Sequence, residues 1–428
     1  MRSPHDVLVR MSCSAADLGA RLAELANRHH VPGAQFAWYD GDDTIVVHTG
    51  VERHGRPVAM DASSKVPIGS ITKACTATVA MMLVADGDLE LDEPVSAVLG
   101  PVAHGDTLTL RHLLCHTSGL PSDPAADATT CSRELAKVAP VCAPGAMFSY
   151  SNFGYAVVGA MIEAATGMSW REAVDAVLCQ PVGIEPAFVD EPLDVAGHVV
   201  SASSVRVVDQ VLPPLLAPAG ALALSAADLV TFGRLHLAEP EPLDATTQMY
   251  TRVAGVQPFG IADGWTLGLS MFDSDKGVEW LGHDGAADGT SCHLRIDQAG
   301  GGVLALTTNA TTGMDLWRSL VEELRSLGVP LARPRARLCR GDPVPLPPEY
   351  TGTYRNGDTE YVVAPDIHGV PCVTVDGEVF PELLVDSDGV FSVREPVSGQ
   401  QADCGRFLLD PYGAVTALEA GGRVARRH

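Results

Sequence analysis

The chain has 428 residues, of which 46% are hydrophobic and 19% charged, and its 53 acidic and 29 basic side chains give a formal net charge of -24. This length exceeds the size at which one hydrophobic core usually stops growing, so we expect two folding units. The negative charge repels phosphate backbones and anionic lipid surfaces, which argues against nucleic acid and membranes as partners.

The amino-terminal segment reaches Asp17 and Glu24 before any apolar run long enough for a secretory signal. No stretch contains the roughly 18 to 20 consecutive apolar residues that a membrane helix needs. We therefore expect a cytoplasmic protein. The ten cysteines are scattered singly, without a C-x-x-C pair, so we expect neither a metal site nor a cofactor.

The first third of the chain alternates between helical and strand patterns. Residues 16–30 have the spacing of an amphipathic helix, and residues 34–40 and 44–50 are typical of a hairpin. The segment from Ser70 to Asp86 is apolar on every side, which predicts a helix buried in the middle of a domain. A nucleophile in its first turn would be rigidly held.

The rest of the chain up to residue 328 predicts an α+β fold, with an antiparallel sheet flanked by helices and a separate helical lobe. Ser225 is the expected N-cap of one of these helices. Helices are expected over 109–116, 151–167, 169–183, 225–240 and 314–328, and strands over 264–272, 278–285, 290–296 and 301–309.

Residues 330–348 are rich in Pro and Arg without periodicity, as expected of a linker. Short strand patterns with Gly and Asp turns follow it to the end of the chain, which predicts a small all-β barrel, lipocalin-like, or a sandwich. The expected division is a domain over residues 1–335 and a small β domain over residues 345–428.

The sequence GSITK places Ser70 and Lys73 three positions apart, so on a helix both side chains project from the same face. A serine hydroxyl needs a group that takes its proton as it attacks, and a desolvated lysine can do this. The alternative for this pattern is a serine that caps a helix, followed by a surface lysine.

Two further patterns carry polar side chains that suit an active site. In FSYSN, the phenol of Tyr150 suits proton relay and the amide of Asn152 suits binding of a substrate carbonyl, while the alternative is a turn with Asn152 as helix N-cap. In GHDG, His283 is either a wall of a cleft or an edge-strand histidine facing water. His112 and His116 invite a zinc hypothesis, but the Glu of H-E-x-x-H is missing.

Together these three patterns resemble the signature elements of the serine β-lactamase and penicillin-binding protein superfamily, S-x-x-K, Y-x-N and K-T-G or H-x-G. They occur here in the same order, and the tyrosine points to the class C branch. Longer segments also resemble that family, among them LTLRHLLCHTSGLP and PAGALALSAADLVTFGRLHL. The resemblance covers about residues 20 to 325.

The resemblance implies a nucleophile at Ser70, a base or proton shuttle at Lys73, and proton exchange by Tyr150. It implies that Asn152 binds the substrate amide and that His283 takes the place of the family's lysine. Two further sets of residues follow from the resemblance alone: a substrate-binding contribution from Asp284 and Gly285, and an oxyanion hole formed by the backbone N–H groups of Ser70 and Ala286.

Two residues depart from the family pattern, and they affect which reaction we expect. His283 and Asp284 stand where many β-lactamases have Lys and Thr, which weakens the expectation of penicillin hydrolysis. We expect an acyl-enzyme on Ser70, formed from a small-molecule or peptidyl ester, thioester or activated peptide. The acyl group would pass to an amine, as in transacylases and penicillin-binding-protein-type thioesterases that cyclise peptides. The alternatives are a carboxylesterase or D-stereospecific peptidase or amidase, and a sensor that stays acylated.

Overall fold

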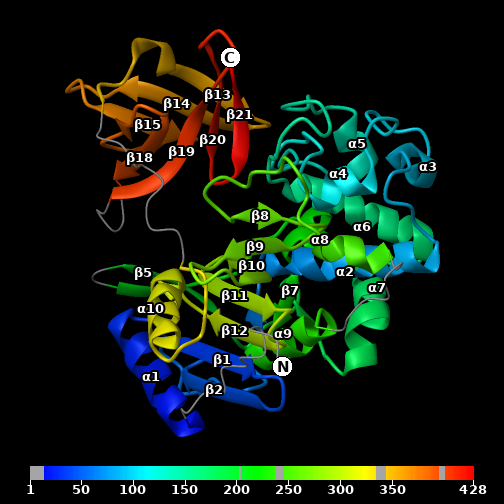
Figure 1. Ribbon diagram of the computed structural model, residues 1–428, viewed down its shortest axis with the longest axis vertical. Coiled ribbons are helices and arrows are strands. Elements are labelled where there is room, and N and C mark those ends of the chain that lie inside the picture. Colours follow the sequence, from blue (N-terminus) through cyan, green and yellow to red (C-terminus); the bar gives the residue numbers. More distant parts are fainter. Residues whose placement is uncertain (1–13, 202–203, 238–244, 334–343, 395–400) are drawn as a thin grey trace, which may run out of the picture. The chain divides into compact units, whose positions relative to one another are not determined.

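The structure is a computed structural model that describes residues 14–201, 204–237, 245–333, 344–394 and 401–428 (Figure 1). These residues form two compact units, each built from separate stretches of chain. Of the predicted linker, residues 334–343 lie outside the described residues, and the domain limits at 335 and 345 remain a prediction. The first unit takes its residues from Met1–Glu90, Val158–Arg252 and Thr266–Arg333, and the second from Leu91–Val157, Val253–Trp265 and Pro334–His428.

The first unit contains an antiparallel sheet whose strands lie in the order β2-β1-β12-β11-β10-β9. The predicted hairpin and the later strands are confirmed. The expected strand over 264–272 is interrupted, because Thr266 donates a backbone hydrogen bond to Leu269 across a tight turn with Gly268 at φ 101°. The bounds are β1 (Gly33–Tyr39), β2 (Thr44–Gly50), β9 (Ser270–Asp273), β10 (Glu279–Ala287), β11 (Thr290–Asp297) and β12 (Gly302–Thr308).

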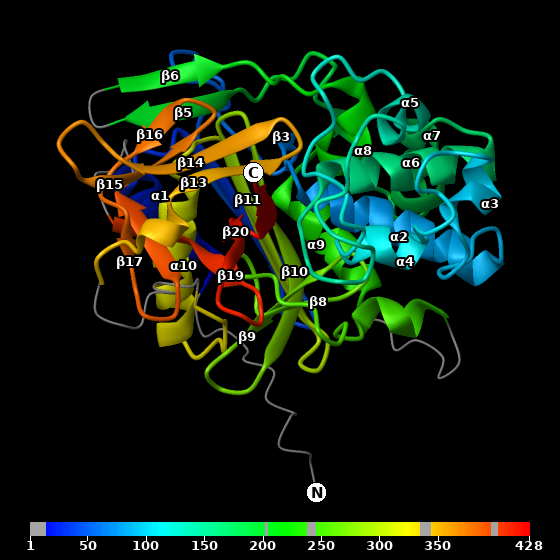
Figure 2. The ribbon, with the colours of Figure 1, turned by 90° about the horizontal axis from the view of Figure 1, so that it is seen from above.

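Helices cover both faces of this sheet (Figures 1 and 2). On one face His293 of β11 stacks on Trp317 of α10 (Gly313–Ser326), which packs beside α1 (Ala15–Arg28). On the other face Leu294 lies against α9 (Ala226–Leu235), where a Cβ added to Gly233 would meet it at 3.4 Å. The predicted buried helix is α2 (Ile71–Asp86), on the same face as α9, and most of its residues are buried.

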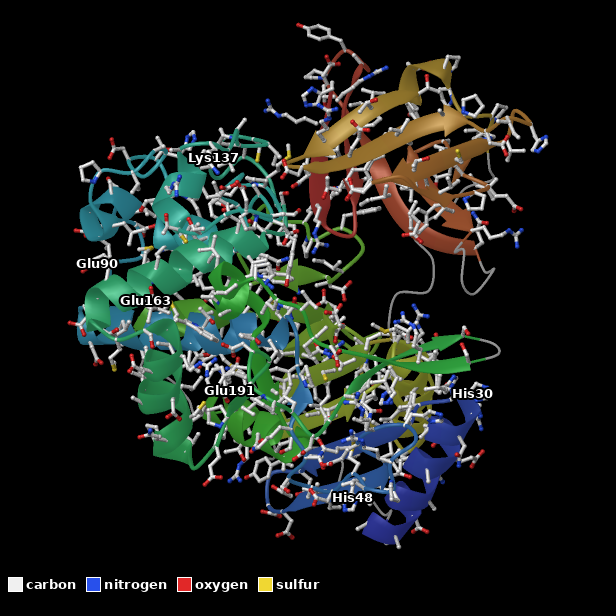
Figure 3. The ribbon with its side chains drawn as sticks, turned by 180° about the vertical axis from the view of Figure 1, so that it is seen from behind. His30, His48, Glu90, Lys137, Glu163 and Glu191 are labelled. Atoms are coloured by element: carbon white, nitrogen blue, oxygen red, sulfur yellow. The ribbon has the colours of Figure 1, made fainter. Side chains whose placement is uncertain are left out.

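The start of α9 is confirmed, because Ser225 caps it in a capping box with Asp228. The single helix expected over 169–183 is divided, since Pro181 has no N–H to continue it. Glu163 of α6, labelled in Figure 3, accepts a backbone hydrogen bond from Trp170. The bounds are α6 (Asn152–Thr166), α7 (Trp170–Ala173), a π-helical segment η1 (Val174–Cys179) and the 3₁₀ turn η2 (Gln180–Val182).

Short elements complete the first unit and connect the larger ones. They are β3 (Val66–Pro67), β4 (Ala187–Phe188), β5 (Gly197–Ser201), β6 (Ser204–Val208), β7 (Leu222–Leu224), α8 (Ala217–Gly220), η3 (Pro214–Leu216) and η4 (Ala245–Tyr250). The strand β7 lies between β3 and β4 in a small sheet of its own. Because β3 ends at Pro67, three residues before Ser70, this small sheet holds the chain that leads into α2.

The second unit contains the helical lobe and the all-β tail. In the lobe are α3 (Val95–Leu99), α4 (Leu110–Leu114), α5 (Cys131–Leu135) and the start of α6, and β8 (Gly264–Trp265) also belongs to this unit. The tail is an antiparallel sheet of nine strands in the order β16-β15-β14-β13-β21-β20-β19-β18-β17, curled as a half-barrel (Figure 1). This confirms the small all-β domain expected from the sequence.

The curled sheet encloses its own hydrophobic core, in which Tyr354, Phe391 and Phe407 are among the largest buried side chains. It begins with a 3₁₀ turn, η5 (Pro348–Tyr350). The strands are β13 (Gly352–Asn356), β14 (Thr359–Pro365), β15 (Pro371–Val375), β16 (Glu378–Phe380), β17 (Leu384–Val385), β18 (Val390–Arg394), β19 (Gln401–Leu409), β20 (Val415–Ala420) and β21 (Arg423–Arg427).

Within the second unit, hydrogen bonds join the tail to the lobe. The carbonyl of Gly422, in the turn between β20 and β21, accepts a bond from the backbone N–H of Tyr150 at 2.8 Å. The side chain of Asn356 accepts from Ser122 N–H at 2.6 Å and donates to the carbonyl of Val424 at 2.7 Å. The turn between β20 and β21 is therefore fixed beside the loop that carries Tyr150.

Candidate active site

Ser70 directly precedes the first residue of α2, and its side chain makes no capping hydrogen bond to the helix. Its Oγ instead lies 3.0 Å from Nζ of Lys73, within hydrogen-bond distance. The two side chains thus meet as their spacing predicts, and the capping alternative does not describe this serine. A hydroxyl held against an amine has the geometry of a nucleophile with its base.

Lys73 is fully buried, at 0% exposure, so it is not a surface lysine. Its Nζ donates to the carbonyl of Ala219 in α8 at 2.8 Å. Because a carbonyl only accepts, this bond orients one N–H away from Ser70. A lysine placed in this way can take the serine proton whenever its amine carries a free lone pair.

The strand β10 lies directly against the backbone that leads into Ser70. A Cβ on Gly285 would meet the carbonyl oxygen of Ile68 at 2.0 Å, and a Cβ on Gly69, whose φ is +51°, would meet that of Ala286 at 2.2 Å. Only glycine fits at either position. Both positions lack space for a Cβ, and the positive φ of Gly69 is in addition a conformation that other residues rarely adopt. The backbone of Ser70 and Ala286 is therefore close, as an oxyanion hole requires, although that role stays a prediction.

His283 points from β10 to the face of the sheet that carries α2, and it is buried, at 3% exposure. Its Nδ1 lies 2.6 Å from the carbonyl oxygen of Asp284. Since that oxygen only accepts, Nδ1 carries the proton in the neutral ring. Burial, and then the positive charge of Lys73, lower the pKa of His283 to about 4, so the imidazole is neutral near pH 7.

Asp284 points to the opposite face of β10. Its carboxylate accepts two bonds from Arg295, at 2.7 and 3.2 Å, and one from Nδ1 of His293 at 2.7 Å. Burial opposes ionisation of Asp284, but these two partners hold its pKa well below the usual range. The side chain of Asp284 is 33% exposed, but both of its carboxylate oxygens are engaged by these partners, so we assign it no direct role in binding substrate.

Tyr150 and its neighbours belong to the second unit. The tyrosine is 6% exposed, and its ring stacks on the imidazole of His116 with 4.2 Å between ring centroids. The guanidinium carbon of Arg423 lies 5.1 Å from the centroid of the Tyr150 ring. This distance is that of a cation–π contact.

Asn152 is the first residue of α6, and Ser151 caps the helix by accepting from the N–H of Gly154 at 2.8 Å. The N-cap alternative for Asn152 therefore does not hold. The amide Nδ2 of Asn152 donates to Asp123 at 2.7 Å. This bond fixes the orientation of the amide.

The two histidines of the zinc hypothesis have other partners. Nδ1 of His116 accepts from the backbone N–H of Ser151 at 3.1 Å, and Nδ1 of His112 lies 3.0 Å from Oγ1 of Thr109. Among the described residues, no group of three or more His, Cys, Asp or Glu side chains is arranged to hold a metal ion. His116 contributes to the site by packing against the ring of Tyr150.

The predicted residues thus form two groups, each confined to one unit. Ser70, Lys73 and His283 are close to one another in the first unit, and Tyr150 and Asn152 in the second. That both groups serve one reaction stays a prediction. Four further residues were not predicted from the sequence, because they lie far along the chain from the motifs or carry no motif of their own: Arg423, Asp123, His293 and Arg295.

Comparison with known proteins identifies the family. The β-lactamase family model matches residues 18–326. Penicillin-binding protein 4 of Amycolatopsis lactamdurans is 33% identical over 344 residues, which are 72% of this chain and 90% of that protein. The chain therefore belongs to the β-lactamase family, whose members are serine acyl-transfer and hydrolytic enzymes, and its fold is the β-lactamase/transpeptidase-like fold.

Solved structures extend the likeness to the tail. The crystal structure of SurE is 36% identical and covers 97% of this chain and 99% of its own, with a TM-score of 0.85. A D-stereospecific amidohydrolase from Streptomyces is 28% identical, with a TM-score of 0.59, and covers 70% of this chain and 98% of its own. In the part of the chain that the structure describes, no helix has the length and hydropathy to cross a bilayer.

Proposed function

We propose that this protein is a serine acyltransferase that forms an acyl-enzyme on Ser70 and passes the acyl group to an amine. The observation that carries the proposal is the contact between Oγ of Ser70 and Nζ of the fully buried Lys73, at 3.0 Å. The acyl donor would be an ester, a thioester or an activated peptide, and the acceptor an amine.

In the acylation step, Oγ of Ser70 attacks the carbonyl carbon of the donor and its proton passes to Nζ of Lys73. The backbone N–H groups of Ser70 and Ala286 stabilise the oxyanion of the tetrahedral intermediate. The intermediate then collapses, the bond to the alcohol or thiol breaks, and the leaving group takes up a proton. An ester of Ser70 remains.

In the transfer step, the amine nitrogen attacks this ester, loses a proton, and Ser70 leaves with a proton returned to Oγ. We assign the proton exchange with the incoming and leaving groups to Tyr150, whose ring lies between His116 and Arg423. Asn152, oriented by Asp123, binds the amide of the acyl group. Arg423 is a cation available to a substrate carboxylate or to the phenolate of Tyr150.

The chemistry of His283 argues against efficient penicillin hydrolysis. The family's lysine at this position supplies a positive charge, whereas His283 is neutral near pH 7 because its pKa is about 4. A neutral imidazole gives little attraction for the carboxylate of a β-lactam. A neutral donor such as an ester or thioester does not need that charge.

Transfer to an amine is favoured over hydrolysis where the acyl-enzyme is shielded from water. The tail supports this, since Gly422 in the turn between β20 and β21 accepts the backbone hydrogen bond of Tyr150, whose side chain is 6% exposed. SurE, whose structure covers 97% of this chain, has also been solved with D-Leu. We therefore place a D-aminoacyl group among the first donors to be tried.

The second candidate is a hydrolase of the same family. It is supported by the D-stereospecific amidohydrolase and by Esterase EstB of Burkholderia gladioli, which is 34% identical over 191 residues, 38% of this chain and 48% of that protein. Both candidates require the same acyl-enzyme. They differ only in the molecule that releases it.

Product analysis separates these candidates. The purified protein is incubated with an N-acylated D-leucine thioester, with and without a range of primary amines, and the products are separated by liquid chromatography. The proposal predicts the amide as the main product when an amine is present. Free acid under every condition would establish the hydrolase, and a modified protein without turnover would establish the acylated sensor.

A further inference from the structure

The carboxylate of Asp284 is held on the face of the sheet opposite to His283. Arg295 binds both of its oxygens, at 2.7 and 3.2 Å, and His293 binds one of them at 2.7 Å. All three residues lie on β10 and β11, where Asp284 is directly opposite His293 in the register. The ion pair therefore ties these two strands together at this point.

The partners of Asp284 are themselves fixed. His293 is completely buried and stacks on Trp317 of α10, with centroids 4.8 Å apart and an interplanar angle of 5°, and its Nε2 lies 3.1 Å from Oγ of Ser291. The guanidinium of Arg295 lies 3.5 Å from the centroid of the Phe272 ring. The carboxylate is thus bound by groups that have little freedom to move.

The backbone carbonyl of the same residue sets the state of His283. It accepts the Nδ1 proton of His283 at 2.6 Å, which leaves the lone pair of the neutral ring on Nε2. The side chain of His283 points to the α2 face, and the charge of Lys73 acts on it. The position of one carbonyl therefore decides which nitrogen of His283 can accept a hydrogen bond.

The same piece of strand also supports the nucleophile. Gly285 is so close to Ile68 that a Cβ would lie 2.0 Å from its carbonyl oxygen. A shift of β10 by a fraction of an ångström would move the backbone before Ser70 as well as the carbonyl of Asp284.

We propose that Asp284 is a positioning residue. Its carboxylate binds Arg295 and His293 on the face of the sheet opposite to His283 and thereby fixes the position of β10. The Asp284 carbonyl then keeps His283 in its Nδ1–H form, and the backbone before Ser70 stays in place. The predicted effect of Asp284 on activity rests on the proposed acyl transfer. It gives Asp284 a role other than the substrate contact that the sequence predicts. The competing explanation is an ion pair that only stabilises the fold.

The test uses the full chain and the substitution Asp284→Asn, which removes the charge and places an N–H₂ group against the donors of Arg295 and His293. The matched control is Asp275→Asn, because Asp275 also binds an arginine, Arg325, at 2.6 and 2.9 Å, but does not contact His283. The first readout is the ¹⁵N NMR spectrum of the histidine side chains, with the His283 signals assigned by their loss in His283→Gln.

We expect Asp284→Asn to shift His283 away from the Nδ1–H tautomer, and Asp275→Asn to leave it unchanged. The second readout is the steady-state rate with the thioester donor. A misplaced strand is expected to lower kcat by about 10- to 100-fold with little change in KM. Asp275→Asn is expected to leave kcat near that of the wild type.

Arg295→Lys supplies a second variant in case Asp284→Asn does not fold, since lysine keeps the charge but cannot bind both oxygens. It should show the same changes to a smaller degree. An unchanged His283 tautomer, with kcat no lower than in Asp275→Asn, would overturn the proposal and leave a stabilising ion pair. The tautomer readout needs no substrate, so it remains decisive even if the proposed acyl transfer fails.

Discussion

The guanidinium carbon of Arg423 lies 5.1 Å from the centroid of the Tyr150 ring, and it comes from β21 in the carboxy-terminal sheet. The backbone bond from Tyr150 to Gly422, at 2.8 Å, holds the turn before Arg423 against the same loop. Within the second unit, the tail is therefore part of the surroundings of Tyr150. We expect it to contribute to the reaction and not only to stability.

Replacing Arg423 tests this contribution. Arg423→Gln removes the cation beside Tyr150 while keeping a polar side chain, and we expect kcat/KM to fall by about tenfold, which corresponds to about 1.4 kcal/mol. The control is Arg355→Gln, since Arg355 pairs with Glu360 on the exposed part of the same tail. Equal activity of both variants, measured with the thioester donor, would refute a role for Arg423.

Lys73 is predicted to act as the base for Ser70. Lys73→Ala should lower the rate of acylation by about 10² to 10⁴-fold, the usual contribution of a general base. Rapid-quench measurement of acyl-enzyme formation gives this rate directly. A variant that acylates as fast as the wild type would show that the contact at 3.0 Å does not serve proton transfer.

Gly285 is predicted to tolerate no side chain. A methyl group there would meet the carbonyl oxygen of Ile68 at 2.0 Å, so Gly285→Ala must push β10 away from the backbone before Ser70. We expect a loss of about 1 to 3 kcal/mol of unfolding free energy together with a loss of acylation. Gly302→Ala is the control, since its Cβ would meet only the Tyr39 carbonyl, at 3.7 Å. Wild-type activity of Gly285→Ala, measured beside urea denaturation, would contradict the predicted contact.

Stability should fall on mild acidification because two buried histidines resist protonation. Burial lowers the pKa of His236 to about 4, and burial with the charge of Lys73 does the same for His283. The unfolded chain takes up these protons as the pH falls below about 6.5, whereas the folded chain takes them up only near pH 4. Each histidine should therefore cost about 2 kcal/mol of unfolding free energy between pH 7 and pH 5.

Urea denaturation at the two pH values measures this loss. In His283→Gln the loss should be smaller by about 2 kcal/mol, because the contribution of His283 is then absent. An identical pH dependence in the variant and the wild type would mean that His283 is not held neutral in the folded protein.

Much of the fold follows from periodicity. The apolar run after Ser70 predicts the buried α2, and the capping pattern at Ser225 predicts the start of α9. The tight turn at Gly268 depends on a local hydrogen bond, and the division of the helix over 169–183 depends on Pro181. Hydrophobic spacing reveals neither feature. In the sheet of the tail, the pairing of β13 with β21 joins strands far apart in the sequence, which local patterns do not predict.

The candidate site divides in the same way. The spacing of Ser70 and Lys73 predicts their contact, because a helix brings such side chains together. Strand alternation indicates that His283 and Asp284 point to opposite faces, yet the partners Arg295 and His293 depend on the pairing of β10 with β11. No local pattern could have placed Arg423 beside Tyr150, since only the folding of the tail onto the lobe does so.

The most direct test of the account is the site of covalent modification. The wild type, Ser70→Ala and Lys73→Ala are incubated with a fluorophosphonate, digested, and examined by tandem mass spectrometry. We expect one adduct on Ser70 in the wild type, none in Ser70→Ala, and strongly slowed labelling in Lys73→Ala. An adduct on another residue, or undiminished labelling without Ser70, would contradict the assignment of the nucleophile.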